Sequence, residues 1–249
     1  MALFRTGTAL IVGWMACAGM AQAAHPLQTE DTGTQGTGNI EFENGLTWSR
    51  TGNTKDFSYQ PQVSYGLTPA LDLIGQPSWL IHRDESGATV RDFGDTNLDA
   101  KWRFFGSAPL SLAVRAGVTL ATSGQGLGNP HGKVATHALI AATYDAAPFT
   151  THFNLGLAQN PSGTDERKRI ASTSAAFMWA VNEQLILTVD GSVAQNPSPA
   201  RKAWPGTLLG GAIYTIKPGL DADIGWQSSL GAAPTTRQWL LGLTYRFAL

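Results

Sequence analysis

Large apolar side chains recur at every second position along most of the sequence. The chain ends on a clear example, in which the alternating apolar residues are Trp239, Leu241, Leu243, Tyr245, Phe247 and Leu249. Neighbouring side chains of an extended strand point to opposite faces, so Arg246 cannot share the environment of Tyr245 and Phe247. A period of two therefore predicts β-strands that have one apolar face and one polar face.

Twelve segments of the chain follow this pattern. We expect strands near residues 38–48, 57–65, 71–81, 98–104, 110–120, 134–144, 149–158, 171–181, 185–193, 208–216, 220–226 and 239–249. The segment at 98–104 alternates most cleanly, because Asp99, Lys101 and Arg103 separate its apolar residues.

The connections between these segments alternate in length. Short turns rich in Gly, Pro, Asp and Asn fall at residues 66–69, 106–109, 145–148, 181–184 and 217–219. Longer polar stretches fall at residues 83–91, 123–133, 160–169, 195–203 and 228–236, and only the connection at 50–54 breaks the rule. An even set of strands with this alternation is typical of outer-membrane barrels, with the turns and both termini on the periplasmic side. We therefore predict an all-β fold, a transmembrane antiparallel up-and-down β-barrel of about 12 strands.

Aromatic residues support the same fold. On the apolar face, Trp48, Trp79, Trp226 and Trp239 fall near the outer strand ends, and Tyr65, Trp102, Tyr144, Phe149, Trp179, Tyr214 and Tyr245 fall near the periplasmic ends. Two aromatic girdles around an aliphatic band suit a barrel in lipid, because these rings prefer the membrane interface. The alternative is an ordinary aromatic core in a soluble β-protein.

The N-terminus predicts export. Arg5, an apolar run at residues 9–18 and an A-x-A pattern ending at Ala23 are typical of a cleaved signal peptide, which we assign to residues 1–23. Cys17, the only cysteine, lies inside it, so the mature chain has no disulfide or thiolate metal site. We expect residues 24–37 to form a periplasmic segment, with insertion into the lumen as one option, and residues 38–249 to form the barrel.

Composition narrows the functional classes. Charged residues make up 14% of the chain, below the roughly 25% usual for soluble domains, and Gly is abundant. A net charge of −1 argues against a nucleic-acid partner, which would need a basic surface. The Gly-rich stretch at 124–128 does not predict a phosphate-binding loop, since no helix follows it that could hold a phosphate at its N-terminus.

Several stretches resemble the outer-membrane protein family of the MetA pathway of phenol degradation, whose members are loosely called transporters. These are "HPLQTEDTGTQGTGNIEFENGLTWSR" (25–50), "YGLTPALDL" (65–73), "FGDTNLDAKWRFF" (93–105), "LAVRAGVTLATS" (112–123), "LLGGAIYTIKPGLDADIGW" (208–226) and the closing "LGLTYRF". The resemblance covers most of the mature chain in order and implies a transporter-like barrel. It carries no catalytic residues, and the family name says little about the solute.

The inward face of the predicted strands holds the candidate solute path. Its candidate residues are Glu41, Glu43, Asp72, Asp95, Asp99, Lys101, Arg103, Arg115, Asp221, Asp223 and Arg246, with Asp190 on the same face. Acids exceed bases, so we expect a polar lumen with a mild preference for cations. These charges either form a constriction that selects solutes or simply keep the wall solvated.

One hairpin allows a sharper expectation. Same-face pairing around the turn at 106–109 sets Asp99 opposite Arg115, an opposite-charge cross-strand pair. A register shift of two residues would put Lys101 opposite Arg115 instead.

Two histidines on the inward face are candidate metal ligands or catalytic bases. His137 and His152 both face inward, but in the expected register they stand four positions apart, too far to share a metal. A Ser-His-Asp hydrolase, as in an outer-membrane phospholipase, is conceivable because such triads are recognised by geometry. No distinctive Ser or His motif favours it, and we predict no enzyme, no metal and no cofactor.

These observations predict a bacterial outer-membrane channel or transporter for passive uptake of small solutes, including aromatic or other hydrophobic compounds. Twelve strands at a spacing of about 4.8 Å and a tilt of about 40° give a radius of roughly 12 Å, which side chains can narrow or close. The expected partners are outer-membrane lipid and lipopolysaccharide, the outer-membrane insertion machinery and a small-molecule solute. The alternatives are a closed structural or adhesive barrel and a lipid-acting enzyme.

Overall fold

The computed structural model of the chain describes residues 25–124, 127–128, 132–161, 166–231 and 234–248. The predicted signal peptide at residues 1–23, including Cys17, lies outside the described residues. Among the residues described, no helix has the length and apolar character needed to cross a membrane.

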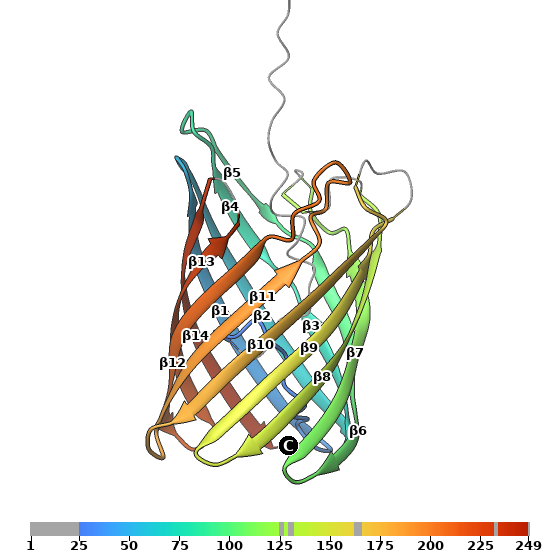
Figure 1. Cartoon of the computed structure of the whole chain (residues 1–249), viewed down its shortest axis with the longest axis vertical. Coiled ribbons are helices and arrows are strands. Elements are labelled where there is room, and N and C mark those ends of the chain that lie inside the picture. The colour runs from blue at the N-terminus through green and yellow to red at the C-terminus, as the bar shows by residue number, and fades with distance from the viewer. Residues whose placement is uncertain (1–24, 125–126, 129–131, 162–165, 232–233, 249) are drawn as a thin grey trace, which may run out of the picture.

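The described chain is a closed antiparallel β-barrel (Figure 1). Its strands are β1 (Asn39–Thr51), β2 (Thr54–Thr68), β3 (Leu71–Gln76), β4 (Trp79–Arg83), β5 (Thr89–Phe93), β6 (Thr96–Ser107), β7 (Leu110–Leu120), β8 (Ala135–Ala146), β9 (Phe149–Gln159), β10 (Arg169–Ala180), β11 (Leu185–Ala194), β12 (Gly206–Lys217), β13 (Leu220–Leu230) and β14 (Thr236–Ala248). Strand β1 pairs with both β2 and β14, which closes the sheet on itself. Closure leaves no open edge between first and last strands, as a medium without hydrogen-bond partners requires.

Two of the barrel strands are interrupted, so the fourteen segments form the twelve strands that the sequence predicts. Both β3 and β4 pair with β2, and their partners β6 and β5 likewise share one position in the wall. The break falls at Pro77, which cannot donate to the ladder. The expected loop at 83–91 was too long, because Thr89 and Val90 already belong to β5 and pair with β4.

Two hairpin registers differ from those expected. In the β6–β7 hairpin Lys101, not Asp99, lies opposite Arg115, so the shifted alternative holds. The expected register was wrong because the chain turns at residues 108–109, later than assumed, with an irregularity between Arg103 and Phe105.

In the β8–β9 hairpin the turn also comes later, between Ala146 and Phe149. His137 therefore lies opposite Ala158, and His152 lies opposite Thr143. Both registers differ from the expected ones by two residues, and a shift of two preserves which face each side chain occupies.

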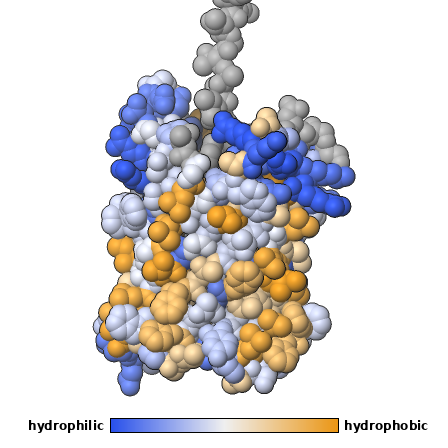
Figure 2. Space-filling view, in the orientation of Figure 1, coloured by the Kyte–Doolittle hydropathy of each residue, from blue (hydrophilic) through white to orange (hydrophobic). Residues whose placement is uncertain are grey.

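The two faces of the wall separate as the alternation predicts. On β6, Asp99 and Lys101 are buried in the interior with 7% and 6% of their surface exposed, whereas Leu98 and Trp102 are 46% and 53% exposed. On the face shown in Figure 2, apolar side chains gather over the strands below a polar end. The apolar face thus meets lipid and the polar face meets the lumen.

Candidate functional site

Residues 25–38, here called the inner segment, lie inside the barrel and contact most of its strands. Near the start of β1, Gly38 N donates to Gly66 O on β2 at 2.8 Å. Gln35 then bridges two walls, because its backbone N donates to Asp72 of β3 at 3.0 Å and its Nε2 donates to Glu41 of β1 at 2.8 Å. The segment therefore enters the lumen from the periplasmic end.

The middle of the inner segment is held by buried ion pairs. Glu30 Oε2 accepts from Arg115 Nη1 of β7 at 2.6 Å, and Glu30 Oε1 accepts from Lys101 Nζ of β6 at 2.7 Å. Lys101 also donates to Asp31 at 2.8 Å. On the opposite side of the chain, Asn154 of β9 binds both the N–H and the C=O of Glu30. These contacts fix the backbone of the segment against three strands.

The beginning of the inner segment reaches the remaining wall. The backbone N–H groups of Gln28 and Thr29 both donate to Asp190 Oδ2 of β11, at 2.6 and 2.8 Å. At the first residue of the segment, His25 Nδ1 contacts Asp223 of β13, and the backbone N of His25 donates to Glu43 of β1 at 3.2 Å. The segment thus makes a turn around the interior.

Glycines on the inward face make room for this path. A Cβ at Gly66 would lie 1.8 Å from Gly36 O, and a Cβ at Gly242 would lie 2.5 Å from His25 Nδ1. At Gly66 the conflict is with the backbone of the inner segment, whereas at Gly242 it is with the side chains of His25 and of Asp223, whose Oδ2 would lie 2.1 Å away. The wall is therefore shaped to accept the segment as well as bonded to it.

The wall charges that face the segment are themselves linked. Arg115 Nη2 donates to Asp99 Oδ2 at 2.7 Å, although the two residues are diagonal and not opposite neighbours. Asp99 Oδ1 also contacts His137 Nε2 at 2.6 Å. The Arg115 side chain is fully buried, and a buried charge is tolerated only when it is paired and hydrogen-bonded.

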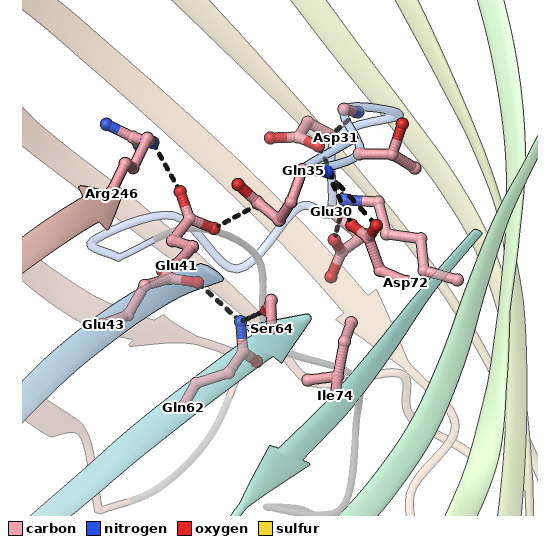
Figure 3. A pocket seen from close by; sticks show the side chains of 13 residues that line it. Glu30, Asp31, Gln35, Glu41, Glu43, Gln62, Ser64, Asp72, Ile74 and Arg246 are labelled. Atoms are coloured by element: carbon pink, nitrogen blue, oxygen red, sulfur yellow. Dashed lines mark hydrogen bonds and ion pairs between the residues drawn. The ribbon is translucent and has the colours of Figure 1, made fainter. Parts of the chain in front are cut away.

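A cavity of about 370 Å³ lies between the inner segment and the wall. It is lined by Glu30, Asp31, Gly33, Thr34, Gln35, Glu41, Glu43, Gln62, Ser64, Asp72, Ile74, Lys101 and Arg246. Figure 3 shows Gln35 between Glu41 and Asp72, with Arg246 pointing to Glu41 and Gln62 linking Glu43 to Ser64. Five acidic side chains against two basic ones make the lining of this cavity acidic.

The structure distributes the predicted lumen residues along the barrel. The cavity is lined by Glu41, Glu43, Asp72, Lys101 and Arg246, and beside it lie Asp99 and Arg115. The inner segment is held by Asp190 and Asp223, while Asp221 binds Arg246. At the two ends of the wall, Arg103 donates to Pro69 O at the periplasmic turn and Asp95 lies at the outer break between β5 and β6. Asp95 and Arg103 are not among the residues that line the cavity.

Several residues that line the cavity were not predicted from the sequence. Gln62 and Ser64 lie on the inward face of β2, but as neutral side chains they carried no charge signal. Glu30 and Asp31 fall in a segment without periodicity. Insertion of residues 24–37 into the lumen was one of the two options above, and inward glycines such as Gly66 and Gly242 could have favoured it, because a Gly in a strand often marks close backbone approach.

The inward face also carries aliphatic side chains. Besides Ile74 of the cavity wall, the larger buried ones are Leu80, Leu139, Ile170, Leu209 and Leu240. They stand among the groups that bind the inner segment, since Leu139 lies opposite Arg115 and Leu209 lies opposite Asp190. The polar interior therefore includes separate apolar patches.

One buried group has the outline of a catalytic triad. Thr119 Oγ1, His137 and Asp99 follow one another, but Thr119 Oγ1 lies 3.4 Å from His137 Nδ1 and donates instead to Asn97 at 2.8 Å. Its proton is thus directed away from the histidine that would have to accept it. Within the part of the chain that the structure describes, no three His, Cys, Asp or Glu residues are grouped to hold a metal.

The closed barrel, its apolar belt and its polar lumen define the chain as a bacterial outer-membrane protein with a channel fold. It belongs to the family described as "Putative MetA-pathway of phenol degradation", whose model matches residues 23–247. The resemblance that the sequence indicated is thereby confirmed.

Solved structures show the same fold. An outer membrane channel from Pseudomonas putida F1 matches with a TM-score of 0.67 and 14% identity over 87% of this chain and 98% of that chain. The KdgM porin in complex with disordered oligogalacturonate matches with a TM-score of 0.58 and 6% identity over 84% and 99%. The toluene transporter TodX of Pseudomonas putida matches with a TM-score of 0.50 and 9% identity over 84% and 89%. The comparison with curated protein sequences finds no significant match.

Proposed function

We propose that the protein is a channel for passive uptake of small solutes, in which the inner segment controls the width of the lumen. The observation that carries this proposal is the cavity of about 370 Å³ between the segment and the wall. Hydrogen bonds and ion pairs to wall side chains hold the segment there. Among the described residues, its backbone–backbone bonds to the strands are confined to its end, where Gly38 N donates to Gly66 O and Gly36 O accepts from Asn39 N. A segment held in this way can move without breaking the barrel.

The solute we favour is an aromatic or other hydrophobic compound of small size. Aliphatic side chains on the inward face, such as Ile74 in the cavity wall, offer an apolar surface to a solute in the lumen. The likeness to a toluene transporter supports this choice at the level of the fold. The acidic lining of the cavity is less suited to anions, so anionic solutes should permeate least.

Permeation can be tested with purified, refolded protein in liposomes. Swelling rates should be measured for neutral aromatic solutes, for sugars of similar size and for aromatic carboxylates. The proposal expects the neutral aromatic solutes to enter fastest and the carboxylates slowest. No permeation of any solute through barrels that are demonstrably folded would contradict the channel proposal.

A closed structural or adhesive barrel is the second candidate. It is favoured by the same ion pairs, since Glu30 with Arg115 and Asp31 with Lys101 fill the middle of the lumen. In that case the inner segment is a permanent part of the barrel interior, and swelling assays should show no difference from protein-free liposomes.

A further inference from the structure

Four basic residues form a continuous row across the outer ends of four adjacent strands. In the strand registers, Arg237 of β14 lies directly opposite Arg50 of β1, Arg50 lies opposite Lys55 of β2, and Lys55 lies opposite Arg83 of β4. All four residues are exposed. We call Arg237, Arg50, Lys55 and Arg83 the basic row.

The basic row faces lipid and not the lumen. Two residues further into the membrane, Trp239, Trp48 and Phe57 form the matching row on the same face, and Trp48 contacts Phe57 with ring centroids 5.4 Å apart. Residues two apart on a strand share a face and are separated by about 7 Å. Since aromatic rings mark the membrane interface, the basic row stands at the depth of the lipid head groups.

The part of the chain that the structure describes provides no ion-pair partner for the row. Among the described residues, none of the four forms an ion pair, and Arg50 Nε donates only to Gly52 O at 3.0 Å. Asp56, next to Lys55, points into the lumen, where it binds His82. Like charges directly opposite one another destabilise a sheet, so this arrangement calls for an anionic partner from outside the protein.

We propose that the basic row binds the phosphate groups of lipopolysaccharide in the outer leaflet. The row lies at the outer end of the barrel, by the brief connection at residues 51–54, on the side away from the chain terminus. Arg and Lys bind phosphate oxygens through charge-assisted hydrogen bonds, and the aromatic row beneath packs against the acyl chains. The lipid thereby covers the strands β14, β1, β2 and β4.

Binding can be measured by native mass spectrometry of the mature protein in detergent, titrated with diphosphorylated lipid A. The test variant is Arg50→Gln/Lys55→Gln/Arg83→Gln/Arg237→Gln. The matched control removes the same charge elsewhere on the outer loops and is Lys168→Gln/Arg169→Gln/Arg201→Gln/Lys202→Gln. Each basic side chain near an anionic lipid surface changes the apparent affinity about fivefold, so the test variant should lose about a hundredfold or more.

The result expected is strong loss in the test variant, little loss in the control, and retained binding in Arg50→Lys/Arg83→Lys/Arg237→Lys, which keeps every charge. Heat-modifiable mobility in electrophoresis establishes that each barrel is folded. Equal binding by the wild type and the test variant, or equal loss in the control, overturns the proposal. Equal binding of lipid A that lacks phosphates also overturns it. Displacement of lipid A by inorganic phosphate alone overturns it as well, and would assign the row to free phosphate.

Discussion

Arg115 of β7 and Glu30 of the inner segment form an ion pair in the lumen, with 2.6 Å between Nη1 and Oε2. No part of the Arg115 side chain is exposed, and only 5% of the Glu30 side chain is. Because an unpaired buried charge is costly, the wall and the segment each stabilise the other's charge. This pair therefore connects the position of the inner segment with the electrostatics of the whole lumen.

Glu30→Gln should loosen the inner segment and increase conductance. The substitution removes the charge that pairs with Arg115 but leaves the bond between Arg115 and Asp99, so we expect docking to weaken by about 1–3 kcal/mol. Single-channel recording in planar bilayers measures the effect. Glu183→Gln, an exposed carboxylate in a periplasmic turn, is the control and should conduct as the wild type does. An unchanged conductance in Glu30→Gln would show that the ion pair does not control the position of the inner segment.

Gly66→Ala should displace the inner segment by steric conflict alone. Its new Cβ would lie 1.8 Å from Gly36 O, whereas a Cβ at Gly210 would meet nothing within 4 Å. We expect higher conductance and faster proteolysis of the segment for Gly66→Ala, and wild-type behaviour for Gly210→Ala. Identical behaviour of the two variants would show that the wall does not depend on close approach at Gly66.

Low pH should weaken the contact between Asp31 and Lys101. Enclosure in the lumen raises the pKa of Asp31, but the charge and the hydrogen bond of Lys101 lower it by a larger amount. The pKa therefore falls from 3.8 to about 2. A lowered pKa stabilises the docked segment at every pH above about 4, and this contribution is lost as the pH falls towards 2. The effect is screened, because 36% of the Asp31 side chain is exposed.

The wild type and Asp31→Asn should therefore differ in conductance at pH 6 and converge near pH 2. Comparing the two proteins at each pH isolates Asp31 from the other carboxylates of the lumen. A difference that persists unchanged at pH 2 would contradict the assignment.

The face on which each strand residue lies could be predicted from the sequence, because it depends only on a period of two. The cross-strand partner of each residue could not be predicted, because it depends on where each hairpin turns. Lys101 and Arg115 show the limit: both were placed in the lumen, yet their register was off by two, and the pair Asp99 with Arg115 forms along a diagonal. The role of Glu30 could not be predicted at all, since nothing in a local pattern indicates which wall residues a segment without periodicity will meet.

The belt in lipid makes a depth-dependent prediction on β9. Leu155, which is 54% exposed, and Gln159 lie on the same outward face, with Leu155 in the middle of the strand and Gln159 at its outer end. Leu155→Arg should destabilise the barrel by about 2–4 kcal/mol and Gln159→Arg by about 0–1 kcal/mol. Urea unfolding in lipid vesicles measures both values. Equal costs would mean that this face does not cross the hydrocarbon.

The most direct measurement compares the conductance of the mature protein with that of a variant lacking residues 25–37, in the same planar bilayers and with barrel folding established by heat-modifiable mobility. We predict a small, cation-favouring conductance for the wild type and a severalfold larger conductance for the variant. Equal conductance in the two proteins would contradict the control of the lumen by its inner segment.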